Sequence, residues 1–445
     1  MVRPPEAGTV LRAAGDAGVE VPGDRRVPRA VPRQDLEARP EGARGGASAR
    51  TLVSPVVLAL RGRIPVPAGG CRGAVAMWRR LFPAGYRPLS MSLAVAPLRP
   101  PPHPRIQGQW RHQVKAWRVH ANGEPREVMR LEEVPDPQPG PGQLLLRVRA
   151  ANVNFPDALL CRGQYQVRPP LPFTPGVEIC GEVLAAGEGA AGETGARVLA
   201  QPPLPDGGFA ELAVVDAAAV RPAPEALDDA EAAALHIGYQ TGWFGLHRRA
   251  RLQAGETLLV HAAAGGVGSA AVQLGKAAGA RVIGVVGGED KARTARELGC
   301  DLVLDRRHDD IVGAVKEATG GRGADVVYDP VGGEAYAKSV KCIAFEGRII
   351  VVGFAGGAIP TPALNHALVK NYAILGLHWG LYNTKDPAAV DACHEELAKL
   401  AAQGAVKPLI GGRFPLRDAA EAVQRVADGT STGRLVVLPA AEETR

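Results

Sequence analysis

A glycine-rich turn near the middle of the chain has the residue types needed to bind the phosphates of a nucleotide. Glycines let the backbone turn tightly and bring its N–H groups against a pyrophosphate at the positive end of a helix. Ala263 stands where the usual pattern has its first glycine, so a plain structural turn is the alternative. An apolar segment before the turn and an Ala-rich helical segment after it favour the nucleotide site. The predicted binding residues are Ala264, Gly265, Gly266, Val267 and Gly268.

The next apolar segment ends in a way that indicates which dinucleotide binds. An enzyme that uses NAD is expected to carry Asp or Glu there to hold the ribose hydroxyls, but this chain has Gly287 and Gly288. A missing carboxylate with cations nearby suits the 2′-phosphate of NADPH, and a solvated surface charge is the alternative for each cation. The predicted phosphate-binding residues are Gly287, Lys291, Arg293 and Arg306, with Arg307 beside them.

These motifs lie in a region where strands and helices alternate. Six apolar segments separated by helical sequences predict a buried parallel sheet. Before them, residues 115–224 form short alternating segments broken by Gly and Pro, which is typical of a β-rich domain. Asp228 and Glu231 form a capping box that should begin a helix between the two regions. The six predicted strands are Thr257–Ala263, Arg281–Val286, Leu302–Asp305, Ala324–Asp329, Arg348–Gly353 and Ala373–Trp379.

Several motifs together resemble one family. They are residues 151–157 (ANVNFPD), 162–165 (RGQY), 172–178 (PFTPGVE), 263–276 (AAGGVGSAAVQLGK) and 378–380 (HWG). The chain resembles the zinc-free quinone oxidoreductases of the zeta-crystallin type, among the medium-chain dehydrogenase/reductases. The resemblance implies a doubly wound six-stranded Rossmann domain, residues 237–380, that binds NADPH. This domain would be inserted into a β-rich GroES-like catalytic domain formed by residues 113–236 and 381–445.

The zinc ligands of the alcohol dehydrogenases in that superfamily have no equivalent here. The resemblance places Asn154, Val177 and Ile237 at the positions of the catalytic Cys, His and Cys. Valine and isoleucine cannot bind a metal, and the six cysteines are widely separated without metal-ligand spacing. The sequence therefore predicts no metal site.

Carbonyl reduction without a metal needs another way to stabilise charge on the acceptor oxygen. Asn154 offers an amide donor that cannot lose its proton, and Tyr165 offers a phenol that could donate or relay one. The resemblance also implies that Asn154 and Thr241 face the nicotinamide, with Gly353 and Phe354 beside it. The alternative is that Asn154 ties a turn while Tyr165 packs between domains.

Other polar candidates favour structural roles. His236 and His261 lie in or beside apolar segments, where a histidine is more often a buried, hydrogen-bonded residue than a catalyst. Cys161 and Cys180 have no basic neighbour in sequence, so we expect them to pack rather than react.

Charge and composition separate the first 110 residues from the rest. They hold 17 Arg, no Lys, 7 acidic residues and 16 prolines, which predicts a low-complexity extension over residues 1–112. No Asp or Glu occurs from Gly42 to Gly123, and the segment from Met77 has the composition of a mitochondrial transit peptide. A matrix location is one expectation; the alternative is a cytoplasmic protein whose basic, Pro-rich extension is GC-rich coding sequence upstream of the authentic start. If Met77 is the true start, the first 76 residues come from an incorrect gene prediction.

Function follows as a ranked expectation. The leading hypothesis is NADPH-dependent hydride transfer to a quinone or similar conjugated carbonyl. Reduction of an enone or enoyl thioester is the alternative, and NADPH-linked RNA binding or a structural role is the third. Residues 111–445 carry a net charge of −4, which counts against RNA or DNA as a partner. The uninterrupted apolar edge strand predicted over Tyr372–Trp379 favours a homodimer, with no membrane insertion.

Overall fold

The computed structural model describes residues 113–439 of the 445-residue chain. The predicted extension 1–112 and its segment from Met77 lie outside the described residues. Within 113–439, no helix is both long enough and apolar enough to cross a bilayer.

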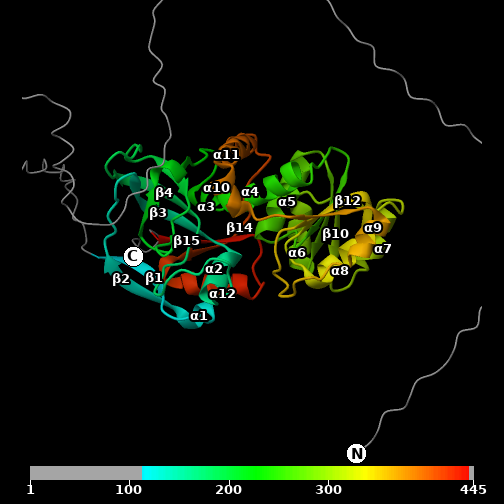
Figure 1. Ribbon diagram of the computed structural model, residues 1–445, viewed down its shortest axis with the longest axis horizontal. Helices are drawn as coiled ribbons and strands as arrows, with labels where there is room; N and C mark the ends of the chain where they lie inside the picture. The colour runs from blue at the N-terminus through cyan, green and yellow to red at the C-terminus, as the bar shows by residue number, and fades with distance from the viewer. Residues whose placement is uncertain (1–112, 440–445) are drawn as a thin grey trace, which may run out of the picture. The chain divides into compact units, whose positions relative to one another are not determined.

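A six-stranded parallel sheet forms one half of the described structure (Figure 1). Its strand order is β10-β9-β8-β11-β12-β13, and every neighbouring pair is parallel. This confirms the predicted doubly wound sheet, whose strands match the six predicted segments in order. The strands are β8 (Thr257–His261), β9 (Arg281–Val286), β10 (Leu302–Asp305), β11 (Ala324–Asp329), β12 (Ile343–Val351) and β13 (Ala373–Gly376).

Helices cover both faces of this sheet. In β8, Leu258 and Val260 pack in one core with α5, whereas Leu259 packs in another with α7 and α8. The alternation places successive side chains on opposite faces, so the strand must be apolar throughout. The helices along the sheet are α5 (Gly266–Ala277), α6 (Glu289–Glu297), α7 (Ile311–Ala318), α8 (Gly333–Cys342) and α9 (Leu364–Lys370).

The second large sheet joins the two ends of the described chain. Its order is β14-β15-β3-β4-β5-β7, with β6 also paired to β3, and β15 runs antiparallel to β3. The C-terminal segment therefore returns to the domain that precedes the parallel sheet, as the predicted insertion requires. The strands are β3 (Gln143–Val153), β4 (Ile179–Ala186), β5 (Arg197–Ala200), β6 (Leu212–Asp216), β7 (Arg221–Pro222), β14 (Ile410–Pro415) and β15 (Arg434–Leu438). A separate hairpin pairs β1 (Gln113–Val119) with β2 (Met129–Pro135).

The remaining helices connect or cover these sheets. Two C-terminal helices, α11 and α12, are followed by Gly404 and Gly429, whose φ angles are 72° and 66°. Only glycine adopts that backbone region readily, which explains where both helices end. The helices are α1 (Pro125–Val128), α2 (Phe155–Cys161), α3 (Asp229–Ala233), α4 (His236–Trp243), α10 (Tyr382–Lys385), α11 (Pro387–Ala402) and α12 (Ala419–Ala427). A π-helical segment, Phe244–Arg249, continues α4, and 3₁₀ turns lie at Ala217–Ala219, Trp379–Leu381 and Leu416–Asp418.

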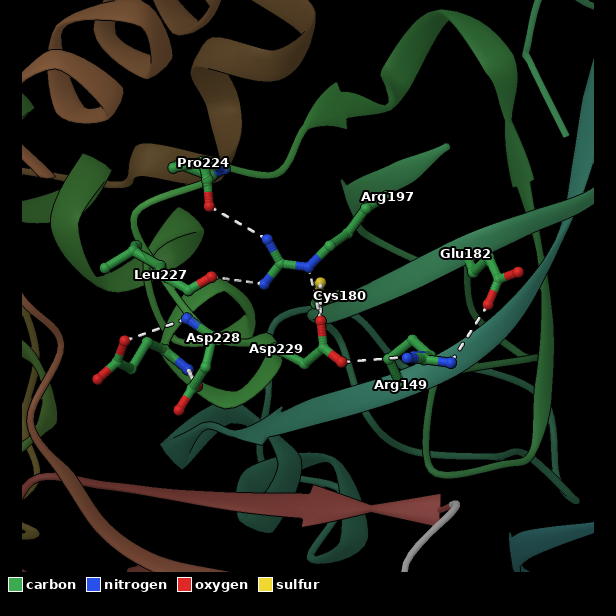
Figure 2. A network of polar contacts seen from close by, with 9 residues as sticks. Arg149, Cys180, Glu182, Arg197, Pro224, Leu227, Asp228 and Asp229 are labelled. Carbon is green, nitrogen blue, oxygen red and sulfur yellow. Dashed lines mark hydrogen bonds and ion pairs between the residues drawn. The ribbon is translucent and has the colours of Figure 1, made fainter. Parts of the chain in front are cut away.

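The predicted capping box begins α3, where the chain leaves the β-rich sheet. Asp228 Oδ1 accepts from the Glu231 N–H at 2.8 Å, and the Asp228 N–H donates to Glu231 Oε2 at 3.1 Å. Figure 2 shows how the next residue is held: Asp229 Oδ1 accepts from Arg197 Nε at 2.6 Å. Arg197 also donates to the carbonyls of Pro224 and Leu227, so one side chain of β5 fixes the loop entering α3.

Packing crosses the predicted domain boundaries. Val390 and Leu397 of α11 lie in the same core as Tyr239 of α4 and Val260 of β8. The boundaries at 236/237 and 380/381 stay predictions, since the helices at both junctions pack together.

Candidate active site

The glycine-rich turn lies between β8 and α5, as predicted. A Cβ added to Gly268 would stand 2.0 Å from the carbonyl oxygen of Ala262, so no other residue fits without moving the backbone. Ala262 itself has φ of 51°, which tightens the turn. Gly265 is the N-cap of α5 and has no side chain to bond the first N–H groups. The helix therefore begins with unsatisfied donors and its positive end, which together suit a phosphate.

Two arginines lie over two glycines at the carboxyl end of β9, and Lys291, whose Nζ donates to the Gly429 carbonyl at 3.0 Å, is near them. The Arg306 guanidinium lies against Gly287, where an added Cβ would be 3.0 Å from Nε, and Arg307 lies against Gly288 at 2.8 Å from Nη1. Lys291 is close enough to both that they lower its pKa, after the larger effect of burial. Among the described residues, neither arginine has an ion-pair partner. The positive charge of these arginines is therefore not neutralised by an acidic side chain in the part of the chain that the structure describes, and it lies beside the nucleotide turn.

Two other charged residues, Arg293 and Asp305, lie on the same segments as these cations. Arg293 differs from the two arginines in having an ion-pair partner, since its Nη2 donates to Asp290 Oδ1 at 3.1 Å, and its side chain is mostly exposed. Asp305, which sequence reasoning missed, accepts from the Gly288 N–H at 3.1 Å and from the Arg307 N–H at 3.0 Å. These bonds lower the pKa of Asp305, with the Arg307 amide contributing most, and they hold the turn on which the arginines lie.

Asn154 is the centre of a buried polar network. Its Nδ2 donates to Glu178 Oε2 at 2.9 Å, and its Oδ1 accepts from Arg434 Nη1 at 3.0 Å. Glu178 Oε2 also accepts from Asn152 Nδ2 at 2.7 Å, and Oε1 accepts from the Ile237 N–H at 2.6 Å. Burial raises the pKa of Glu178, whereas Arg434 and these donors oppose the rise. The network joins β3, β4, α4 and β15 around one amide.

The alternative prediction, that Asn154 holds a turn, also has support. Asp157 accepts from the backbone N–H of Asn154 at 2.7 Å and from that of Gly176 at 2.9 Å, in the capping box that begins α2. Burial raises the pKa of Asp157 to about 7, and the amide donors limit the rise. Asp157 therefore has a structural role through backbone N–H groups, which leaves the Asn154 side chain available for the network around Glu178 and Arg434.

Tyr165, Thr241 and Phe354 have different degrees of exposure. Tyr165 is partly buried against the core of the β-rich domain, and burial raises its pKa, followed by the Asp157 charge. Next to it, Gln166 Nε2 and His378 Nε2 lie 3.3 Å apart, so this loop reaches the end of the parallel sheet. Thr241 is buried, and its hydroxyl donates to the Ile237 carbonyl at 2.6 Å. Phe354 is exposed in the loop after β12, with Gly353 before it.

The two histidines and two cysteines for which we expected packing roles, His236, His261, Cys161 and Cys180, are buried. His236 Nδ1 lies 3.2 Å from Gln240 Nε2, and His261 Nε2 lies 2.8 Å from Ser339 Oγ. Burial lowers the pKa of His236 to about 3, so the ring is neutral near pH 7. Burial also raises the thiol pKa of Cys161 and Cys180 to about 12, which leaves little thiolate for chemistry. Over residues 113–439, no group of three or more His, Cys, Asp or Glu side chains is placed to hold a metal ion.

Besides Asp305, the sequence interpretation did not assign Arg434 and Glu178. Glu178 had a signal, because it ends the 172–178 motif. Arg434 had none: it begins a short apolar strand near the C-terminus and resembles any strand-end cation. Its backbone neighbour Gly433 donates its N–H to the Ala264 carbonyl at 2.8 Å, so β15 begins at the nucleotide turn.

A doubly wound sheet with a glycine turn, inserted into a β-rich domain that contributes polar groups beside it, is the architecture of the medium-chain dehydrogenase/reductases. Residues 140–225 match the family described as alcohol dehydrogenase GroES-like domain, and residues 266–395 match the zinc-binding dehydrogenase family.

Individual relatives are more specific. Quinone oxidoreductase-like protein 2 homolog of Nematostella vectensis is 39% identical, covering 67% of this chain and 82% of the relative. Quinone oxidoreductase-like protein 2 of Rattus norvegicus is 35% identical over 74% of this chain and 93% of its own length. The solved Escherichia coli quinone oxidoreductase, complexed with NADPH, superimposes with a TM-score of 0.68 at 30% identity, covering 73% of this chain and all of that one. The chain belongs to the quinone oxidoreductase family of medium-chain dehydrogenase/reductases.

Proposed function

We propose that this protein is an oxidoreductase that transfers hydride from NADPH to a quinone or similar conjugated carbonyl, without a metal. The observation that carries the proposal is the group of Lys291, Arg306 and Arg307 at the end of β9, where an NAD enzyme would hold a carboxylate. Relatives named quinone oxidoreductases, one of them complexed with NADPH, support both the cofactor and the reaction.

The residues of the site divide the work. The amides at the start of α5 bind the pyrophosphate and the three cations bind the 2′-phosphate. NADPH, when bound, supplies the hydride. Asn154 donates an N–H to the acceptor oxygen as negative charge develops there, and Tyr165 supplies or relays the proton that completes the hydroquinone. Thr241, Gly353 and Phe354 line the nicotinamide end.

The test is NADPH oxidation against a panel of quinones, enones and enoyl thioesters, with and without a metal chelator. We expect turnover of small quinones that chelator leaves unchanged. Turnover abolished by chelator would contradict the metal-free reaction. Failure with all three classes, together with measurable RNA affinity, would move the assignment to a non-enzymatic role.

Reduction of an enoyl thioester is the second candidate. A mycocerosic acid synthase-like polyketide synthase of Mycobacterium tuberculosis contains a segment 32% identical to 70% of this chain, which is 15% of the synthase. A synthase with an acid product handles acyl substrates, and the same hydride geometry would serve an enoyl group. Turnover restricted to enoyl substrates in the panel would favour this candidate.

We propose a homodimer joined through β13, which ends the parallel sheet. The Leu377 N–H donates to the Val351 carbonyl, so the alternating backbone directs the N–H groups of Ile374 and Gly376 away from β12. Apolar side chains beside this edge are exposed, with Leu364, Leu368 and Val369 of α9 each about three-quarters accessible. An open edge with an apolar flank suits a second copy of the same strand.

Gly376→Pro is expected to split this dimer. Proline removes an N–H that points outward and leaves the bonds to β12 in place. Gly376→Ala is the matched control, because an added Cβ meets nothing within 4 Å. Sedimentation should show a monomer for the proline variant and a dimer for the alanine variant. A monomeric unmutated protein at micromolar concentration would refute the proposal.

We propose a mitochondrial matrix location, encoded in the segment from Met77. A fluorescent protein fused after residues 77–112 should enter mitochondria, because the segment is basic and lacks acidic residues. Replacing Arg79 and Arg80 with Glu should leave the fusion in the cytoplasm. A cytoplasmic signal from the unmutated fusion would contradict the proposal.

A further inference from the structure

Arg434 is a buried cation without a carboxylate partner at ion-pair distance among the described residues. Its side chain is 4% exposed, at the first position of β15. Nη1 donates to Asn154 Oδ1 at 3.0 Å, while Nε and Nη2 have no hydrogen-bond partner within residues 113–439. Burying a guanidinium with so few hydrogen bonds is unfavourable for folding, so the buried position of Arg434 points to a functional role rather than to stabilisation.

Two glycines make room for this side chain. A Cβ added to Gly238, in the first turn of α4, would overlap Arg434 Nη2 at 1.6 Å. A Cβ added to Gly266, the first residue of α5, would stand 3.0 Å from Arg434 Nε. The guanidinium therefore lies between the helix that carries Thr241 and the helix that begins at the nucleotide turn. It reaches Asn154 from the cofactor side of the network.

The two partners of Asn154 fix the orientation of its amide. Arginine only donates and a carboxylate only accepts, so the amide oxygen must face Arg434 and the nitrogen must face Glu178. One amide hydrogen is used by Glu178 Oε2 at 2.9 Å. The other faces the Asn152 carbonyl at 3.5 Å, at the outer limit of a hydrogen bond. That weakly used hydrogen is free to bind an acceptor oxygen.

We propose that Arg434 is a positioning residue, which holds the Asn154 amide and polarises it through Oδ1 so that its second N–H binds the acceptor oxygen during hydride transfer. A cation on the amide oxygen withdraws electron density and strengthens the N–H as a donor. The charge of Arg434 also opposes the rise that burial causes in the pKa of the Glu178 carboxyl. The proposal rests on the proposed function, in which Asn154 binds the acceptor.

Substitution at Arg434 should reduce the chemical step more than cofactor binding. For Arg434→Met we expect kcat with a small quinone to fall by about 100-fold, the size of effect seen when a reacting group is misplaced or one polarising donor is lost. The NADPH dissociation constant, measured by quenching of protein fluorescence, should change by less than about 3-fold, because the pyrophosphate is bound by backbone amides. Arg434→Lys should recover most of kcat, since an ammonium can still donate to Oδ1.

Arg425→Met is the control. It removes the same charge from the same C-terminal segment, but Arg425 is half exposed and pairs with Glu421 at 3.0 Å. Its kcat should stay within about 2-fold of the unmutated protein.

Gly238→Ala tests the same contact from the other side. Its new Cβ would push the guanidinium off Asn154, so kcat should fall in the Arg434 background. In the Arg434→Met background the same change should add little, which gives a strongly non-additive cycle. This cycle separates the contact from a general loss of folding, which would add in both backgrounds.

The outcomes distinguish this inference from the proposed function. If the unmutated protein reduces no quinone, enone or enoyl thioester, the proposed function itself is wrong. Active protein whose Arg434→Met variant keeps its kcat, or whose Lys and Met variants lose kcat and thermal stability equally, would overturn the positioning role while leaving the function intact.

Discussion

Gly268→Ala is expected to abolish measurable NADPH binding and to lower the melting temperature by about 5 °C or more. The new Cβ would stand 2.0 Å from the Ala262 carbonyl oxygen and 2.7 Å from its carbon, and both atoms belong to the backbone. The turn must open to relieve the overlap. Opening it moves the first amides of α5 away from the pyrophosphate, so binding and stability fall together.

Gly265→Ala provides the matched comparison within the same turn. Its Cβ would lie 3.1 Å from the same oxygen, and its φ of −87° suits alanine. The melting temperature of the cofactor-free protein should therefore change little, by about 1 °C. Differential scanning calorimetry and fluorescence titration measure both quantities. Equal melting temperatures for the two variants would show that the close contact at Gly268 does not hold the turn.

Combined Lys291→Glu and Arg306→Glu substitution is expected to reduce the preference for NADPH over NADH by about 100-fold or more. In the proposed function each cation makes a charge-assisted bond to the 2′-phosphate, and each carboxylate would repel it. NADH binding should be almost unchanged, because its ribose carries no phosphate. Dissociation constants for both dinucleotides at one fixed ionic strength test this expectation.

Arg296→Glu is the control for this pair. Arg296 lies on α6 with Lys291, but it is exposed and pairs with Glu289 at 2.8 Å. The NADPH preference should change by less than about 2-fold. Tighter NADH than NADPH binding by the unmutated protein would contradict the assignment of this end of β9.

The arrangement of the parallel sheet was predictable because its signals are local. Strands such as β8 are buried at every position and mostly apolar, since both faces are covered, and the glycine turn follows β8 directly. The capping box of Asp228 and Glu231 also acts over three residues, and it begins α3 as predicted. Steric and hydrogen-bonding rules that operate between near neighbours in sequence need no knowledge of the rest of the fold.

The distribution of cations at the end of β9 was only partly predictable. From the sequence, four cations were equally good candidates for binding the 2′-phosphate, because each follows a strand end: Lys291, Arg293, Arg306 and Arg307. The structure brings Arg306 and Arg307 over the two glycines and pairs Arg293 with Asp290 instead. Lys291 and Arg293 lie on α6 whereas Arg306 and Arg307 lie in the turn after β10, and charge type alone does not reveal where each side chain ends.

By itself, the sequence determined the doubly wound sheet, the nucleotide turn and the family. Tertiary structure alone decided what surrounds Asn154. Arg434 lies 280 positions away and reaches Asn154 because β15 pairs antiparallel with β3. The guanidinium fits there because Gly238 and Gly266 leave space between two helices. Such a contact depends on strand pairing and helix packing between distant segments, and neither residue type nor spacing along the chain carries that information.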